Sequence, residues 1–355
     1  MYRVIPYQQQ YFDQVVSLLA AFWRINRELA ARYFRWKYLD NPWADKVYIS
    51  LLLDKDVAIG MRGAYLMPLC IGGDSERICS FFGDSFIDEA RRGGNSFSRL
   101  NDQLFGMLAG DGIDIALNTT ASPGVRLFSL RSGWQETDPV MTMSYRESRP
   151  ENLGNSFSQV DGILDKWQRE GEGWLHYTNK VYVDGLAQLA SDLRRNSRIH
   201  VLKSESYLRW RFANPMGQYR FLYYFSAEGD SNLTSNRGGV GELLAFVVLA
   251  VDKVPMLTSS WIADWGARDE RALRKVLELL LKINPFARLT MMHQPAGQTM
   301  NETFSGLGFE KDQVSADERL TILSRTLGTN TDSALKQSLT VLDHWTLAAL
   351  NLDSV

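Results

Sequence analysis

The chain has 355 residues, of which 45% are hydrophobic and 23% are charged, and its formal net charge is −2. These are ordinary values for a globular protein, and the length favours two domains over one. The near-neutral charge argues against nucleic acid as a partner, since neutralising phosphates requires a basic surface. The longest apolar run, residues 243–251, is too short to span a bilayer, and no signal peptide is visible. We therefore expect a cytoplasmic protein with no membrane partner.

Strand and helix patterns alternate through the first half of the chain. Residues 2–7 read as a strand, and residues 12–25 carry apolar side chains at helical spacing. Three antiparallel strands are expected next, followed by a helix, a strand, a short helix and a final strand. These elements are predicted over residues 47–53, 57–71, 77–87, 97–112, 113–120, 122–134 and 140–145.

A similar order of elements returns in the second half, after a polar stretch at residues 146–156 and a short helix predicted over residues 160–170. We therefore predict a mixed α/β fold with largely antiparallel sheets in two tandem units. The predicted boundaries are residues 1–148 for the first unit, 149–178 for a linker and 179–355 for the second unit. The elements expected in the second unit are helices over residues 183–195 and 268–283 and strands over residues 219–226, 242–251, 259–265 and 288–293.

One phrase occurs twice and is the clearest sign of an internal repeat. Residues 33–43 read YFRWKYLDNPW, and residues 207–216 read YLRWRFANPM. Both copies keep the phrase although they differ elsewhere, so we favour a structural role over an acceptor-binding one. We expect Trp36 and Trp210 to be packed.

A basic, glycine-containing turn stands between the third antiparallel strand and the helix that follows it. It consists of Arg91, Arg92, Gly93, Gly94, Asn95 and Ser96. This turn and the order of elements around it resemble the GNAT superfamily of acyl-CoA-dependent N-acyltransferases, and in particular its long members with two tandem units. The family motif is Q/R-x-x-G-x-G/A, which Arg91 and Gly94 match, whereas Ser96 stands where Gly or Ala is usual. The resemblance is better over residues 1–145 than over residues 175–325.

The residue types of this turn suit the diphosphate of acetyl-CoA. A turn that leads into a helix exposes backbone N–H groups with no intrahelical acceptor, and glycines let the backbone approach an anion closely. The alternative is a solvated turn that merely caps a helix. The resemblance implies acetyl-CoA as the donor and assigns further contacts to it at Phe86, Ile87, Asn118, Ser122 and Phe128.

Asp84 is the candidate general base. It lies on the strand before the turn, where similar enzymes place a carboxylate, and simple strand alternation puts it on the same face as Phe82 and Phe86. The alternative is that Asp84 occupies a bulge or pairs with an arginine. Phe128 stands at the place where the family often has a proton-donating tyrosine. Phenylalanine cannot donate, so Ser122 or Ser129 would have to substitute, or the thiolate would leave unassisted.

The second unit has no equivalent of the glycine turn. Its corresponding segment reads GARDERALRKV, and Asp269 and Glu270 at the start of the helix would repel a diphosphate. We therefore interpret the second unit as a degenerate copy that supports the first or helps to shape the acceptor pocket.

The resemblance implies an N-acetyltransferase that moves an acyl group from CoA to a primary amine of a small molecule, such as an amino sugar or amino acid derivative. Two alternatives stay open: an aminoacyl-tRNA-dependent transferase of the FemAB type, and a non-catalytic acyl-CoA-binding protein. The four histidines are scattered without metal-ligand spacing, so we expect no metal. A monomer and a homodimer are both compatible with the sequence.

Overall fold

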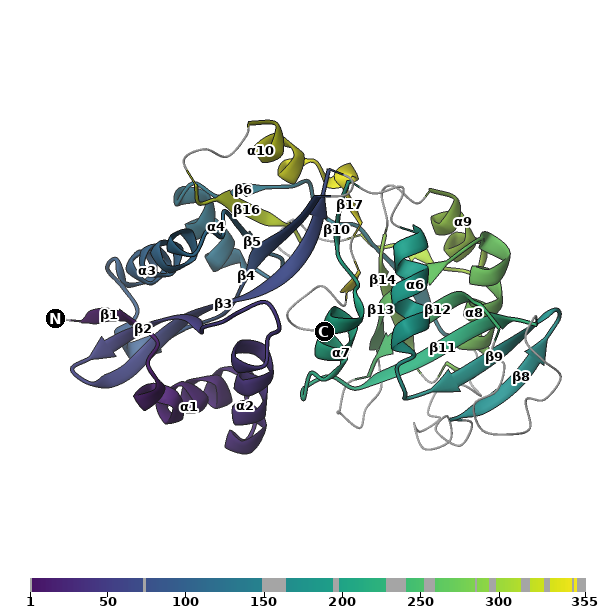
Figure 1. The fold of residues 1–355 in the computed structure, drawn as a ribbon, viewed down its shortest axis with the longest axis horizontal. Coiled ribbons are helices and arrows are strands. Elements are labelled where there is room, and N and C mark those ends of the chain that lie inside the picture. Colours follow the sequence, from purple (N-terminus) through teal and green to yellow (C-terminus); the bar gives the residue numbers. More distant parts are fainter. Residues whose placement is uncertain are drawn as a thin grey trace.

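The structure is a computed structural model that describes residues 2–72, 75–148, 164–193, 198–227, 241–251, 259–284, 286–293, 298–313, 320–328, 333–346 and 348–349. Two mixed β-sheets lie side by side, and helices cover both faces of each (Figure 1). The predicted fold class, mixed α/β in two tandem units with mostly antiparallel strand pairs, is confirmed.

In the first unit α1, α3 and α4 lie on predicted helical segments, whereas α2 was not predicted from the sequence. In α1 the buried side chains Val15, Val16 and Leu19 form one stripe, and Asn26 caps α2 by accepting a hydrogen bond from the Leu29 N–H at 2.8 Å. The elements are β1 (Arg3–Pro6), α1 (Phe12–Trp23), α2 (Arg27–Phe34), β2 (Tyr48–Asp54), β3 (Val57–Ile71), β4 (Ser75–Ile87), α3 (Ser96–Gly110), β5 (Ile115–Asn118), α4 (Pro123–Arg131), β6 (Gln135–Glu136) and β7 (Thr142–Arg146).

The second half repeats this order with one correction to the predicted elements. The short helix expected over residues 160–170 is wrong in its described part, because Lys166–Glu170 is a strand that pairs with Gly173–Thr178 through a turn at Gly171, whose φ is +58°. The elements are β8 (Lys166–Glu170), β9 (Gly173–Thr178), α6 (Val183–Leu193), β10 (Ile199–Val201), α7 (Glu205–Phe212), β11 (Tyr219–Ser226), β12 (Leu243–Ala250), β13 (Ser259–Ala267), α8 (Glu270–Ile283), β14 (Arg288–Met292), α9 (Gln298–Gly306), β15 (Glu310–Lys311), β16 (Leu323–Thr326), α10 (Ser333–Thr340) and β17 (Trp345–Thr346).

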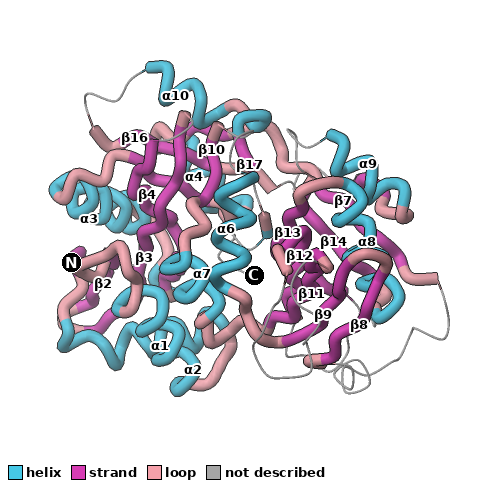
Figure 2. Tube along the Cα trace, turned by 45° about the vertical axis from the view of Figure 1, so that its right-hand side comes forward, coloured by secondary structure: helices cyan, strands magenta, loops and turns pink. Residues whose placement is uncertain are grey.

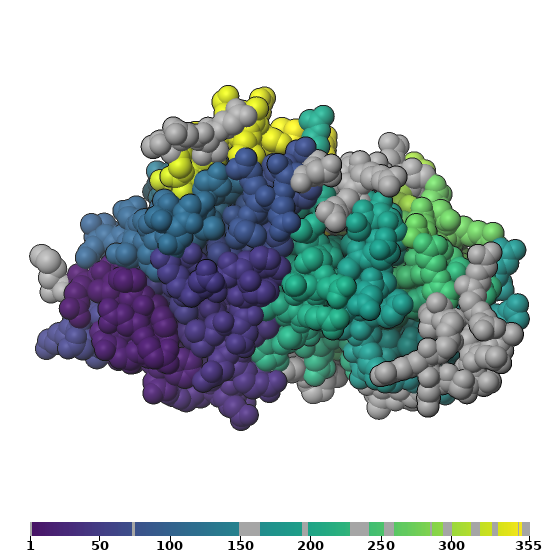
Figure 3. Space-filling model, viewed as in Figure 1, coloured from purple at the N-terminus to yellow at the C-terminus, as the bar shows by residue number. Residues whose placement is uncertain are grey.

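The two units exchange strands. The first sheet has the order β1-β2-β3-β4-β5-β16-β6, and the second has the order β15-β7-β14-β13-β12-β11-β9-β8. Strand β16 from the end of the chain therefore lies inside the first sheet, and β7 from the first half lies inside the second. In Figure 3 the yellow C-terminal residues accordingly pack on the blue part of the first half.

Because of this exchange, the predicted domain boundaries do not coincide with the limits of the two sheets. A cut at residue 148 or residue 179 would separate strands that belong to one sheet, because sequence periodicity shows that a segment is a strand but not which strand it pairs with. Part of the predicted linker, residues 149–163, lies outside the described residues. Its remaining part forms β8 and β9 of the second sheet.

The main hydrophobic core lies between the two sheets. One cluster of buried side chains combines residues of α1 and α2 with residues of α6 and α7, whereas α3 and α8 belong to separate clusters on the outer faces. Figures 1 and 2 show α1 and α2 on one side of the first sheet and α3 on the other. The two units therefore meet through their corresponding helical faces.

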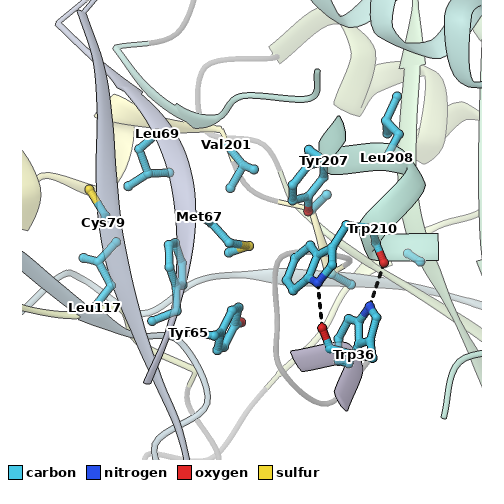
Figure 4. Packing of buried hydrophobic residues seen from close by; sticks show 14 of the residues in the cluster. Trp36, Tyr65, Met67, Leu69, Cys79, Leu117, Val201, Tyr207, Leu208 and Trp210 are labelled. Carbon is cyan, nitrogen blue, oxygen red and sulfur yellow. Dashed lines mark hydrogen bonds between the residues drawn. The ribbon is translucent and has the colours of Figure 1, made fainter. Parts of the chain in front are cut away.

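The repeated phrase forms the centre of this contact. The rings of Trp36 and Trp210 stack with centroids 5.0 Å apart and planes inclined by 13°. Each indole N–H donates to the backbone carbonyl of the other tryptophan, at 2.6 Å from Trp36 and 2.9 Å from Trp210 (Figure 4). The prediction that both tryptophans are packed is confirmed, and their reciprocal bonds place a local pseudo-twofold axis between the units.

Candidate functional site

The glycine turn lies where the sequence predicted it, between the end of β4 and the start of α3. Gly93 and Gly94 have φ angles of +138° and +59°. A Cβ atom added to either glycine would meet no atom within 4 Å. The glycines are therefore required by the backbone conformation and not by crowding within the protein, and the space beside them is open.

Several backbone N–H groups at this turn are free to bind a ligand. The N–H of Arg92 donates to the Glu89 carbonyl and that of Arg99 to the Asn95 carbonyl, but the N–H groups of residues 93–98 have no acceptor among the described residues. The 15-residue helix α3 begins at Ser96 and has no acidic residue in its first turn. The free N–H groups and the positive end of the helix together favour an anion at this place.

The two arginines of the turn brace it in this structure. Arg91 pairs with Asp54 at 3.0 Å and donates to the Tyr2 hydroxyl at 3.1 Å. The Arg92 Nε donates to the Ile87 carbonyl at 3.1 Å. Their side chains are 45% and 59% exposed, so both guanidinium groups remain accessible from solvent. Their contact with a diphosphate stays a prediction.

Strands β4 and β5 separate next to the turn. They are paired in parallel only where Ser80 and Phe81 face Ala116 and Leu117, whereas β4 continues to Ile87. From residue 82 onward, the edge of β4 that faces β5 has no partner strand among the described residues. The predicted donor-binding positions 86 and 87 lie on this open edge. Their side chains are partly buried against neighbouring hydrophobic residues, and the Ile87 carbonyl accepts from Arg92.

A β-bulge places Asp84 differently from the sequence prediction. Gly63 pairs with Gly83 and Arg62 with Ser85, so Asp84 is the extra residue, and its φ is +43°. The bulge interrupts the strand alternation. Asp84 therefore does not share a face with Phe82, which packs against α3, and points instead toward α1 and α2. The expected shared face was therefore wrong for Phe82, whereas Phe86 lies on the α1 side with Asp84, where its ring is 6.3 Å from that of Phe22.

The Asp84 carboxylate is surrounded by hydrogen-bond donors. It accepts from Lys37 Nζ at 2.8 Å, Tyr38 OH at 2.6 Å, Trp23 Nε1 at 2.9 Å and Tyr33 OH at 3.3 Å. The Asp84 and Lys37 side chains are both 0% exposed. A general base must reach the proton that it removes, directly or through one water. This closed carboxylate therefore does not favour the predicted base role. It fits the alternative that Asp84 occupies a bulge and pairs with a cationic side chain, which is a lysine here and not an arginine.

The second unit repeats this pair without the glycine turn. Asp264 lies beside the bulge of β13 and pairs with Lys203 at 2.7 Å, and its side chain is 3% exposed. A carboxylate–ammonium pair at the fourth strand is thus common to both units. Its presence in the unit that lacks the anion-binding turn favours a role in holding the bulge, and the base role of Asp84 stays a prediction.

The predicted residues after β5 have mainly local roles. The Asn118 Oδ1 accepts from the Thr120 N–H at 3.1 Å, and the Ser122 hydroxyl caps α4 by accepting from the Val125 N–H at 3.5 Å. Phe128 is 51% exposed and touches Phe97 of α3 at a ring distance of 5.7 Å. These positions flank the open edge of β4, but no interaction here assigns them a ligand.

The residue of α4 that points into the first unit is Ser129. It is 1% exposed, and its hydroxyl has no hydrogen-bond partner among the described residues. Phe128, which the sequence placed where the family often has a proton-donating tyrosine, is 51% exposed. The difference follows from helix geometry, because neighbouring residues on a helix point about 100° apart.

Comparisons with known proteins identify the fold. No family model and no curated protein sequence matches the chain. Among solved structures, a probable N-acyltransferase from Enterococcus faecalis V583 is similar with a TM-score of 0.62 and 10% identity, covering 92% of this chain and 73% of that one. A tandem GNAT protein from the clavulanic acid biosynthesis pathway has a TM-score of 0.54 and 11% identity, covering 93% of this chain and 100% of that one. The chain has the tandem GNAT fold.

A third neighbour shows how widely this fold is used. The N-myristoyltransferase of Saccharomyces cerevisiae, solved with bound myristoyl-CoA, has a TM-score of 0.54 and 11% identity and covers 91% of this chain and 78% of that one. At such identities the likeness establishes the GNAT fold and does not transfer residue roles.

The helix of the second GNAT unit that corresponds to α3 begins in a different chemical environment. Asp269 caps α8 by accepting from the Ala272 N–H at 2.8 Å, and Glu270 follows in the first turn. Arg268, just before the helix, is paired with Asp192 at 2.7 Å. Asp269 thus occupies an N–H group that an anion could otherwise use, and both carboxylates repel negative charge. That the second unit does not bind the donor stays a prediction.

Sequence reasoning missed the partners of Asp84 and the inward position of Ser129. Lys37 and Tyr38 are part of the repeated phrase, which was interpreted through its tryptophans. The signal that could have found Ser129 is the similarity of residues 127–134 to residues 303–309, which puts Ser129 at the position of the apolar Phe304.

Among the described residues, no group of three or more His, Cys, Asp or Glu side chains could hold a metal. None of the described helices combines the length and apolar character needed to cross a membrane.

Proposed function

We propose that the protein is an N-acyltransferase that moves an acyl group, most simply acetyl, from CoA to a primary amine of a small molecule such as an amino sugar or amino acid derivative. One observation carries the proposal. In the first unit, the N–H groups of residues 93–98 have no acceptor among the described residues; they stand at the start of α3, whose first turn has no acidic residue, next to the open edge of β4. The fold is shared with N-acyltransferases.

The geometry suggests how the donor would lie. The diphosphate would accept from the N–H groups of residues 93–98, and the amide chain of the pantetheine would run along the open edge of β4 from residue 87 toward residue 82. The thioester would then lie near the bulge at Asp84, where the extra residue interrupts the ladder.

The reaction requires little of the protein beyond positioning. The amine nitrogen attacks the thioester carbonyl carbon, the C–S bond breaks, and the thiolate receives the proton that the amine loses. In this proposal Asp84 acts as a positioning residue, because its bonds to Lys37 and Tyr38 hold the bulge in a left-handed conformation that non-glycine residues rarely adopt.

A pair of matched variants tests the donor site. Gly94→Asp and Gly94→Asn both place a side chain in open space at a φ of +59°, which Asp and Asn tolerate best among non-glycine residues. Only the aspartate adds negative charge beside the bound diphosphate. In calorimetric titrations with acetyl-CoA, we expect binding by the wild type and by Gly94→Asn, and a loss of about tenfold or more in Gly94→Asp.

The outcomes separate the candidate functions. Absence of acetyl-CoA binding by the wild type would refute the proposal, and equal affinities of the Asp and Asn variants would move the diphosphate away from residue 94. Retardation of aminoacyl-tRNA in a gel, without acetyl-CoA binding, would favour the transferase of the FemAB type. Binding without thiol release across a broad panel of amines would favour a non-catalytic acyl-CoA-binding protein.

A further inference from the structure

Three buried polar side chains lie between α3 and α4 without hydrogen-bond partners. Asn101, Ser129 and Trp134 are 2%, 1% and 4% exposed. Within the described parts of the chain, neither amide atom of Asn101, nor the Ser129 hydroxyl, nor the Trp134 indole N–H has a protein partner. Buried polar groups are normally satisfied, because leaving them unpaired costs free energy. We call these three residues the polar cluster.

The polar cluster surrounds the point where β4 leaves β5. Phe82 is the first residue of β4 beyond that pairing, and its ring lies 5.3 Å from Trp134 and 5.5 Å from Phe105. Asn101 lies one helical turn before Phe105 on the same face of α3. Ser129 is linked to the same place by the last turn of α4, where its carbonyl accepts from the Trp134 N–H at 3.1 Å.

The second unit provides an internal control for these positions. The Phe309 N–H donates to the Phe304 carbonyl at 3.1 Å, so Phe304 and Phe309 correspond to Ser129 and Trp134. The buried residues of α3 and α8 match with either Leu273 or Leu277 at the position of Asn101. These residues of the second unit are 0% to 2% exposed, and the rings of Phe304 and Phe309 touch at 5.2 Å.

The comparison between the units separates fold from function. Apolar side chains fill these positions in the unit without the anion-binding turn, so the fold does not need polar atoms there. Polar atoms occur only in the unit that carries the turn. Residues that break a local packing rule without structural compensation are expected at functional sites.

We infer that the polar cluster receives the acyl end of the donor and selects acyl groups that carry a hydrogen-bond acceptor oxygen beyond the thioester. This inference rests on the proposed function. The cluster offers donors from the Asn101 amide, the Ser129 hydroxyl and the Trp134 indole, which an oxygen atom satisfies and an alkyl chain leaves unpaired. Arg62 adds positive charge to the same wall, with its guanidinium 5.1 Å from the centre of the Phe82 ring.

Binding of four probes to the full chain tests this inference. Dissociation constants would be measured by calorimetry for CoA, butyryl-CoA, 3-hydroxybutyryl-CoA and succinyl-CoA. We expect at least one oxygenated acyl-CoA to bind about tenfold more tightly than butyryl-CoA, and the two oxygenated probes distinguish a hydroxyl from a carboxylate. Asn101→Leu is expected to reduce this preference while CoA itself binds unchanged.

The possible results keep the two proposals apart. If CoA does not bind, the proposed function fails. If CoA binds and butyryl-CoA binds as tightly as both oxygenated probes, the proposed function survives and the inference about the polar cluster is overturned, with ordered water as the occupant of the cluster.

Thermal unfolding of unliganded protein adds an independent readout. Asn101→Leu and Trp134→Phe introduce the kind of residue found at Leu277 and Phe309 and remove unpaired polar atoms. Both variants are expected to raise the unfolding temperature, whereas the matched control Leu277→Asn in the second unit should lower it. A lower unfolding temperature in both first-unit variants would show that the polar groups serve the fold, and would overturn the inference.

Discussion

The buried Lys37–Asp84 pair gives the sharpest test of how the bulge is held. Lys37→Met leaves a carboxylate at 0% exposure with only neutral donors, and Asp84→Asn leaves an ammonium group at 0% exposure beside the hydroxyl of Tyr33, 2.8 Å away. Breaking one partner of a buried ion pair costs about 3–5 kcal/mol. Each single variant should therefore lose a large part of a total stability that is typically about 5–15 kcal/mol.

The double variant separates a pair from two independent residues. Lys37→Met with Asp84→Asn removes both charges, so its cost should lie roughly 2 kcal/mol or more below the sum of the single costs. Equilibrium urea unfolding followed by tryptophan fluorescence would measure all three values. The matched control is Lys203→Met in the second unit, where the lysine side chain is 18% exposed and the cost should be smaller.

Two results would refute the reasoning about this pair. Single variants that each cost less than about 1 kcal/mol, or costs that simply add, would show that the charges do not depend on each other. A stable Asp84→Asn protein that binds acetyl-CoA normally but has lost turnover, with an altered pH–rate profile, would restore Asp84 as the general base.

Three further predictions follow from the arrangement of the units. Trp36→Phe and Trp210→Phe each leave one buried carbonyl without its donor, so each should cost about 1–3 kcal/mol in urea unfolding, and an effect near zero would contradict the reciprocal bonds. Burial, which outweighs a nearby carboxylate, lowers the pKa of His176 below its ordinary value of 6.5, so the unfolded state binds the proton more readily. Stability should therefore fall as the pH drops from about 7.5 to 5.5, less steeply in His176→Gln, and equal slopes would count against it. Residues 1–148 expressed alone lack β16 and should aggregate, whereas co-expression with residues 149–355 should give a complex in size-exclusion chromatography; a soluble, folded fragment would show that the exchanged strand is dispensable.

The sequence by itself determined the repeated organisation and the place of the glycine turn. The two Trp-Asn-Pro phrases are long enough to identify a duplication, and their tryptophans are packed as predicted. Paired glycines between a strand and a helix indicate an unusual backbone conformation, because few other residues adopt positive φ. Apolar periodicity located α1, α3, α6 and α8, since a buried helical stripe must recur every three to four residues, but it did not show α2 and α7 at the repeated phrase.

Only the tertiary structure decided how these elements pair and which way their side chains point. Strand periodicity does not name a partner, so the exchange of β7 and β16 could not be read from it. One extra residue at Asp84 reverses the faces of the strand beyond it, and one residue of helix separates the exposed Phe128 from the buried Ser129. Local sequence fixes the period of an element, whereas its phase relative to the core is set by long-range packing. The partners of Asp84 and the polar cluster depend on that phase.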